Sequence, residues 1–166
     1  MLQAKTVLFV CTGNTCRSFM AETIGRHYLK RWGREKYLLI RSAGTDTQAG
    51  RPASCFARMV MKKLGMELFE HQTTCLSPQL AEEADLILCM TQGHLARVRQ
   101  YIPAGCDRIY SLKGYALGLN ESTAGQTLDI PDPFGLSEES YRLCARELEN
   151  YVPSALERFM EKLNLF

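Results

Sequence analysis

Residues 6–18 read Thr-Val-Leu-Phe-Val-Cys-Thr-Gly-Asn-Thr-Cys-Arg-Ser, an apolar run followed at once by small and polar residues. The run over 6–10 is typical of a buried strand. The residues after it are typical of a turn. Ser18 can then cap a helix in which Met20, Ile24 and Tyr28 recur at helical spacing. The segment therefore predicts a strand, a tight loop and a helix in direct succession.

The rest of the chain continues this alternation. Further strands are predicted over 37–40, 85–90 and 108–110, and helices over 52–64, 78–83, 91–102 and 137–163. We expect Pro153 to kink or break the last helix. Residues 113–132 lack periodicity and predict a long loop. Alternation without repeats or linkers predicts an α/β fold with a parallel sheet, formed by one domain over residues 1–166.

Composition excludes several classes of protein. The 166 residues are 46% hydrophobic and 23% charged, as in ordinary globular proteins, and 20 basic against 18 acidic residues give a net charge of +2. The basic residues are scattered, which argues against nucleic acid as a partner. There is neither a signal peptide nor an apolar run long enough to span a membrane. Seven cysteines, an odd number, then indicate reduced thiols and a cytoplasmic location.

The segment after the first strand has the chemistry of an anion site. In open α/β sheets ligands bind beyond the carboxyl ends of the strands, and backbone N–H groups at a helix start hold anions. Cys11 begins this loop, where a thiolate is stabilised, and Arg17 ends it with a planar fork suited to two phosphate oxygens. We expect a cysteine nucleophile that attacks phosphorus. The alternative is a purely structural turn in which Cys11 is buried and has no catalytic role.

A proton donor for the leaving group is expected in Asp129-Ile-Pro-Asp-Pro-Phe-Gly135. Two prolines stiffen this segment, and Asp132 is biased to an extended conformation because it precedes Pro133. A rigid turn with a solvated Asp132 is the alternative.

These residues resemble the low-molecular-weight protein phosphatase family, also called low-molecular-weight protein-tyrosine phosphatases. The resemblance rests on residues 10–18 with Met20-Ala-Glu22, on Ser42-Ala-Gly-Thr45 and on Asp132-Pro-Phe-Gly135. It implies a three-layer α/β/α fold, a four-stranded parallel sheet, and a phosphate-binding loop between the first strand and first helix. It also implies a two-step reaction through phosphocysteine, with no metal and no cofactor.

The resemblance assigns roles residue by residue. Cys11 would be the nucleophile, Arg17 the phosphate ligand and Asp132 the acid and then the base. Ser42 and His71 would support the loop, although His71 fits a surface histidine equally well. Phe19 stands where the family usually has proline, which should loosen the helix start slightly. The residues expected to bind phosphate or substrate are Thr12, Gly13, Asn14, Thr15, Cys16, Ser18 and Phe134.

The substrate class depends on two of these positions. Thr15 and Phe134 look like the bacterial protein-arginine phosphatases of this family, whereas tyrosine phosphatases usually carry isoleucine and two tyrosines there. A small polar Thr15 leaves room for a planar guanidinium, and Asp132 can pair with it. Phosphoarginine in proteins is thus the favoured substrate and phosphotyrosine the alternative. A monomer acting on phosphorylated proteins is expected.

Other functions that cysteines support are less consistent with this sequence than a phosphatase. Thiol-coupled arsenate reductases share the loop but need two further cysteines close together, and the sequence shows no such pair. Zinc binding lacks a second cysteine pair or a spaced histidine pair, and a binding module would not need Cys11, Arg17 and Asp132 together. Cys16 can form a protective disulfide with Cys11, as in relatives, or can be a small buried side chain.

Overall fold

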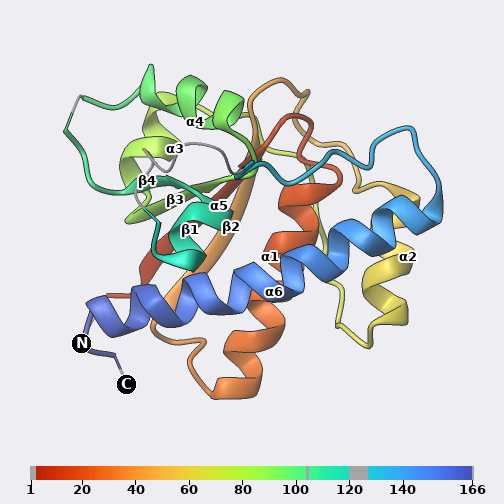
Figure 1. The fold of residues 1–166 in the computed structure, drawn as a ribbon, viewed down its shortest axis with the longest axis horizontal. Helices are drawn as coiled ribbons and strands as arrows, with labels where there is room; N and C mark the ends of the chain where they lie inside the picture. Colours follow the sequence, from red (N-terminus) through yellow and green to blue (C-terminus); the bar gives the residue numbers. More distant parts are fainter. Residues whose placement is uncertain (1–2, 104, 120–126, 166) are drawn as a thin grey trace.

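The computed structural model describes residues 3–103, 105–119 and 127–165. Its centre is a four-stranded parallel sheet with the strand order β2-β1-β3-β4 (Figure 1). The strands are β1 (Lys5–Cys11), β2 (Leu38–Gly44), β3 (Leu86–Cys89) and β4 (Ile109–Ser111). The helices are α1 (Arg17–Trp32), α2 (Cys55–Lys63), α3 (Pro78–Glu83), α4 (Gln92–Arg99), α5 (Leu112–Leu117) and α6 (Glu138–Lys162).

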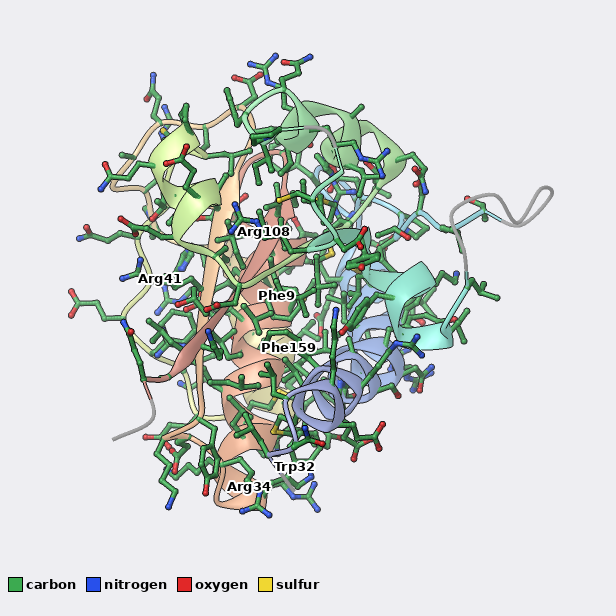
Figure 2. All side chains as sticks on the ribbon, turned by 90° about the vertical axis from the view of Figure 1, so that its left-hand side faces the viewer. Phe9, Trp32, Arg34, Arg41, Arg108 and Phe159 are labelled. Atoms are coloured by element: carbon green, nitrogen blue, oxygen red, sulfur yellow. The ribbon has the colours of Figure 1, made fainter. Side chains whose placement is uncertain are left out.

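Helices cover both faces of the sheet, as expected for this fold class. One face of the central strand β1 presents Val7 and Phe9 to a core shared with α1, α2, α5 and α6. The other face presents Leu8 and Val10 to α3 and α4. Burial on both faces explains why this strand is a continuous apolar run rather than an alternating one. Figure 2 shows Phe9 of β1 and Phe159 of α6 in the interior.

Two helix starts differ from the sequence prediction. Ser18 does not cap α1: the helix begins at Arg17 after Cys16, without a side-chain cap. The Ser18 hydroxyl instead forms buried contacts with Cys11 and Asn14, in the loop before the helix. The second helix begins at Cys55 rather than at 52, because the backbone N–H of Ser54 donates to Thr15 O at 2.9 Å and keeps this stretch beside the loop.

The prediction of a loop from residue 113 is wrong in its first part. Leu112–Leu117 forms α5, with Ser111 accepting a hydrogen bond from Gly114 N and with Gly118 in the left-handed conformation at its end. Leu112 and Tyr115 are buried against the core. Six residues are too few to show helical periodicity, so burial and the two caps carry this helix. Residues 120–126 of the predicted loop lie outside the described residues.

Of the two outcomes expected at Pro153, a kink or a break, the break does not occur. α6 continues from Glu138 to Lys162 although proline removes one backbone donor. Leu148, Val152 and Ala155 are fully buried around this point, where α6 packs on α1. Packing of the apolar face therefore outweighs the missing hydrogen bond. Among the described residues, no helix combines the length and the apolar character that crossing a bilayer requires.

Candidate functional site

A cavity of about 220 Å³ opens at the carboxyl end of β1, where the 11–17 loop leads into α1. It brings together three segments that are far apart in the sequence: this loop, the turn after β2 and the segment before α6. The lining residues are Cys11, Thr12, Gly13, Thr15, Cys16, Arg17, Asp46, Asp132 and Phe134. All three predicted catalytic residues are among them, and Asp46 is a residue that the sequence analysis did not single out.

The guanidinium of Arg17 is buried at this cavity with an unsatisfied donor. Nη1 donates to Ile130 O at 3.0 Å, and Nη2 lies 3.2 Å from Oδ2 of Asp132. The Nε donor is buried and has no hydrogen-bond partner in the part of the chain that the structure describes. A buried N–H without a partner is costly, and such groups in native proteins commonly mark a ligand site. An oxyanion in the cavity would satisfy it.

The thiol of Cys11 is held by a directional hydrogen-bond network. The backbone N–H of Thr74 donates to Asn14 Oδ1 at 2.9 Å, so the amide nitrogen of Asn14 faces Ser18 and Ser42. Since Ser18 Oγ accepts from Asn14 at 2.8 Å, its own proton is free for Cys11 Sγ, 2.9 Å away. The network thus directs a donor at the sulfur, which stabilises a thiolate.

The tight turn of the loop falls on Asn14 rather than on Gly13. Asn14 has a φ of 56°, a left-handed conformation that costs free energy in a residue other than glycine. His71 Nε2 lies 2.8 Å from Asn14 O and fixes this peptide from the outside. Phe19 is buried and stacks near His71, with ring centroids 4.9 Å apart. The residue that replaces the usual proline therefore packs beside the loop.

Glu22 extends the network and was quoted in the sequence analysis without a role. Its carboxylate is buried, and it accepts a hydrogen bond from Ser42 Oγ. It also pairs with Arg26 Nη2 at 2.6 Å, one helical turn further on. Glu22 lies four residues after Ser18, on the same face of α1, which is the spacing that could have pointed to it.

His94 is a second residue that sequence reasoning missed. Its Nε2 lies 2.8 Å from Thr12 Oγ1 and its Nδ1 lies 3.0 Å from Thr91 Oγ1. Burial, with the nearby charge of Arg17, lowers the pKa of His94 to about 4 and keeps the ring neutral at physiological pH. Thr91 Oγ1 already accepts from His94 N, so its proton goes to Nδ1. Nε2 then donates to Thr12.

The segment carrying Asp132 is anchored at one end and open at the other. Ile130 N donates to Met90 O at 2.8 Å, at the end of β3. Two residues later the Asp132 side chain is 47% exposed, and its Oδ1 accepts from Phe134 N at 3.1 Å. Phe134 is 71% exposed although it lines the cavity. The ring has room to contact a substrate side chain at the mouth.

The thiol of Cys16 lies on the α6 side of the loop. Its Sγ is 3.3 Å from Tyr141 OH and 3.5 Å from Thr15 Oγ1. Burial raises the pKa of the Cys16 thiol, and burial followed by the Cys16 contact raises the pKa of Tyr141 to about 12. Both groups are therefore protonated near neutral pH.

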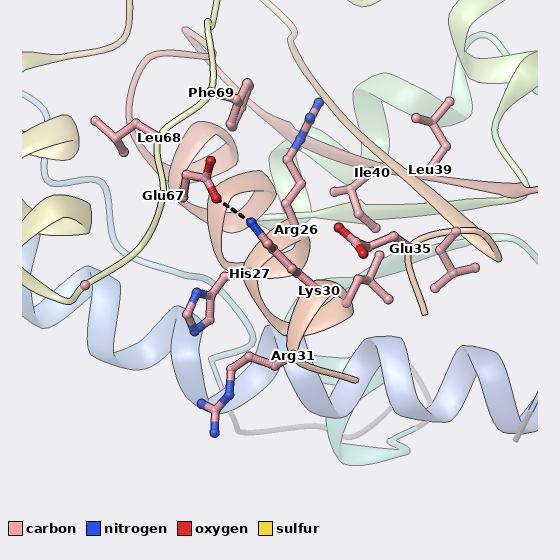
Figure 3. A pocket seen from close by; sticks show the side chains of 13 residues that line it. Arg26, His27, Lys30, Arg31, Glu35, Leu39, Ile40, Glu67, Leu68 and Phe69 are labelled. Carbon is pink, nitrogen blue, oxygen red and sulfur yellow. Dashed lines mark hydrogen bonds and ion pairs between the residues drawn. The ribbon is translucent and has the colours of Figure 1, made fainter. Parts of the chain in front are cut away.

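A larger cavity, of about 730 Å³, lies between α1, β2 and the segment around Phe69 (Figure 3). The ion pair of Lys30 and Glu67, at 2.7 Å, crosses it. It is lined by none of the predicted site residues. Within the part of the chain that the structure describes, no group of three or more His, Cys, Asp or Glu side chains is placed to hold a metal ion.

Comparison with known proteins identifies the family. Residues 6–165 match the family described as low molecular weight phosphotyrosine protein phosphatase. The chain belongs to this family. It is therefore a cysteine-based phosphatase, and the expected fold of a low-molecular-weight phosphatase is confirmed.

Individual phosphatases of this family resemble the chain over nearly its whole length. A protein-arginine-phosphatase of Geobacillus stearothermophilus is 37% identical over 95% of both chains. A low molecular weight protein-tyrosine-phosphatase of Acinetobacter johnsonii is 34% identical over 80% of this chain and 82% of its own. A solved arginine phosphatase mutant with a phosphorylated active-site serine has a TM-score of 0.84 and 30% identity, covering 97% of this chain and 99% of that one.

Proposed function

We propose that this phosphatase removes phosphate from phosphoarginine in proteins, through a phosphocysteine on Cys11. The observation that carries the proposal is the buried Arg17 guanidinium, whose Nε lacks a partner, in the same cavity as Cys11 and Asp132. An oxyanion is the ligand that this arrangement accepts. The solved relative with a phosphorylated active-site serine supports transfer of phosphate to the protein.

The proposed reaction has two steps. In the first, Cys11 Sγ attacks phosphorus, the bond from phosphorus to the leaving nitrogen breaks, and Asp132 gives its proton to that nitrogen. In the second, Asp132 takes a proton from water, which attacks phosphorus and releases the Cys11 thiolate with inorganic phosphate. Arg17 and the backbone N–H groups of residues 12–17 stabilise the equatorial oxygens in both steps.

The remaining residues of the site hold these groups in place. Asn14, Ser18, Ser42 and His71 keep the loop in its left-handed turn and direct a donor at the sulfur. Thr12, Gly13 and Cys16 contribute loop backbone to the phosphate cradle. No metal or cofactor takes part in the proposed steps.

Phosphoarginine is favoured over phosphotyrosine by the walls of the cavity. Thr15 is small and polar, and Phe134 is the single aromatic side chain among the described residues that line the cavity. A planar guanidinium fits beside a hydroxyl, and Asp132 can form a hydrogen bond to the reacting nitrogen. The relative that matches over 95% of the chain is named a protein-arginine-phosphatase. Phosphotyrosine hydrolysis is the second candidate, because the exposed Phe134 ring could also stack on an aromatic substrate.

The working form is proposed to be a monomer that meets phosphorylated proteins in the cytoplasm, where its seven cysteines stay reduced. Arsenate reduction remains the remote alternative. It would require a relay through two further cysteines.

A side-by-side hydrolysis assay tests the proposal. Peptides of one sequence carrying phosphoarginine or phosphotyrosine are compared for kcat/KM. We expect phosphoarginine to be preferred and both activities to vanish in Cys11→Ser. Cys106→Ser, which changes an exposed thiol before β4, serves as the matched control and should keep full activity. Preference for phosphotyrosine would overturn the substrate assignment, and activity retained by Cys11→Ser would overturn the mechanism.

A further inference from the structure

Asp46 lines the cavity, is exposed, and has a backbone fixed by hydrogen bonds of the turn after β2. Its backbone N–H donates to Thr12 O at 3.0 Å, and the preceding Thr45 N donates to Cys11 O at 2.9 Å. The turn after β2 is therefore pinned to the 11–17 loop. Among the residues that the structure describes, none forms a hydrogen bond or ion pair with the Asp46 side chain. Asp46 nevertheless lines the cavity with the candidate catalytic residues.

The charges around the cavity make this carboxylate unusual. Among the described residues that line the cavity, Arg17 is the only lysine or arginine, and it is already paired with Asp132. Asp46 therefore adds uncompensated negative charge beside a thiolate and a cradle that must receive a phosphate dianion. A negative charge in the wall of this cavity repels a phosphate dianion. A phosphate ester of a neutral alcohol offers nothing to offset this repulsion.

A guanidinium leaving group reverses the sign of the interaction. Phosphoarginine keeps N–H donors on the nitrogens that do not carry the phosphoryl group, and carboxylates accept from such donors with strong, directional hydrogen bonds. Asp132 is committed to the reacting nitrogen in the proposed mechanism. Asp46 is the other carboxylate residue among the described residues that line the cavity, and it can accept from the other nitrogens.

Resting on the proposed function, we propose that Asp46 is a specificity-determining residue that binds the guanidinium of phosphoarginine and disfavours phosphotyrosine. The turn is held by the Asp46 backbone N–H, and the Asp46 side chain forms no hydrogen bond or ion pair with any described residue. The side chain is therefore free to act on a substrate rather than to hold the turn. Thr15 supplies room and a hydroxyl, and Asp46 supplies the charge.

The test measures a ratio of two activities on the same enzyme sample. For wild type, Asp46→Asn and Asp46→Glu, kcat/KM is determined on matched phosphoarginine and phosphotyrosine peptides. We expect Asp46→Asn to lower the ratio of phosphoarginine to phosphotyrosine activity about tenfold, the effect of losing one charge-assisted hydrogen bond. Asp46→Glu should retain most of the preference. The control Asp107→Asn makes the same charge change at an exposed turn before β4 and should leave the ratio unaltered.

Loss of folded protein cancels in this ratio, so a destabilised variant still gives an answer. A ratio that is the same in Asp46→Asn and wild type would overturn the role of Asp46 while leaving the proposed function intact. A ratio that falls equally in Asp107→Asn would also overturn it, because net charge alone would then explain the effect. If wild type fails to cleave phosphoarginine at all, the proposed function itself is overturned.

Discussion

Replacing Gly44 with alanine would push a methyl group into the backbone of the 11–17 loop. An added Cβ would lie 2.5 Å from Thr12 O and 3.1 Å from Asn14 N. Carbon and oxygen cannot approach so closely, and both neighbours are backbone atoms rather than flexible side chains. Either β2 or the loop must therefore shift by several tenths of an ångström. Overpacking of this kind costs about 2 kcal/mol of unfolding free energy. For a protein of this size, that loss corresponds to a melting temperature lower by about 4–8 °C.

Activity should suffer more than stability in the folded fraction of Gly44→Ala. The displaced atom belongs to the peptide between Thr12 and Gly13, which contributes an N–H to the proposed phosphate cradle. We expect kcat to fall at least about tenfold, since small misplacements of catalytic groups have large effects on rate. Thermal unfolding and hydrolysis of an aryl phosphate measure the two effects.

A matched control is Gly93→Ala in α4. The added Cβ there meets Thr91 Oγ1 at 3.5 Å, an ordinary contact, so this variant should be as stable as wild type or slightly more stable. If Gly44→Ala melts at the wild-type temperature with full activity, the close approach of β2 to the loop does not constrain the site as described.

Three further variants test separate parts of the account. Asn14→Ala removes three side-chain hydrogen bonds at a left-handed position, and kcat should fall about a hundredfold while the enzyme remains folded; unchanged turnover would refute the network's role. The pKa of His94 is about 4 in the folded state, below its ordinary 6.5. Between these two values the unfolded protein binds more protons than the folded protein, so the free energy of unfolding falls by up to about 3 kcal/mol as the pH falls from 6.5 to 4. Urea unfolding of His94→Gln should lack this loss, and equal pH slopes in the two proteins would contradict it. If Cys11 and Cys16 form a protective disulfide, the Cys16→Ser variant should stay inactive when a thiol reductant is added after peroxide treatment. Recovery of activity in this variant would exclude such a disulfide.

The parts of the fold that could be predicted from the sequence are those with strong local signals. β1 is apolar on both faces and ends at Cys11, where the loop begins, so its place at the centre of the sheet follows from burial. α5 could not be predicted because its six residues depend on two caps and on burial against α6. The intact α6 at Pro153 likewise depends on tertiary packing, which no local rule contains.

Within the candidate site, residues in segments with strong local signals were predicted, and residues on other strands were not. Cys11, Arg17 and Asp132 were predicted to share a site, and they line one cavity. Ser42 and His71, to which the family resemblance gave a supporting role, both lie within hydrogen-bond distance of Asn14 in the loop. His94 and Asp46 were missed because they reach the loop from the ends of other strands.

A rule about strand ends could have found the missed pair. Each follows the carboxyl end of a strand that neighbours β1, the edge where ligands bind in parallel sheets. Polar residues just after β2 and β3 deserved the same scrutiny as those after β1. The contacts they make, His94 Nε2 with the Thr12 side chain and Asp46 N with Thr12 O, depend on atomic positions that only the structure supplies.

The most direct test of the central claim is to trap the covalent intermediate. Because Asp132 serves in both proposed steps, its removal would also slow formation of the intermediate, so the wild-type enzyme is mixed with a phosphoarginine peptide, quenched within one turnover and analysed by peptide mass spectrometry. The account predicts one phosphoryl group on the peptide containing Cys11, and none on that peptide when Cys11 is replaced by alanine or when the peptide substrate is omitted. A phosphoryl group on another residue, or turnover through the quench interval without any labelled peptide, would contradict a phosphocysteine mechanism at Cys11.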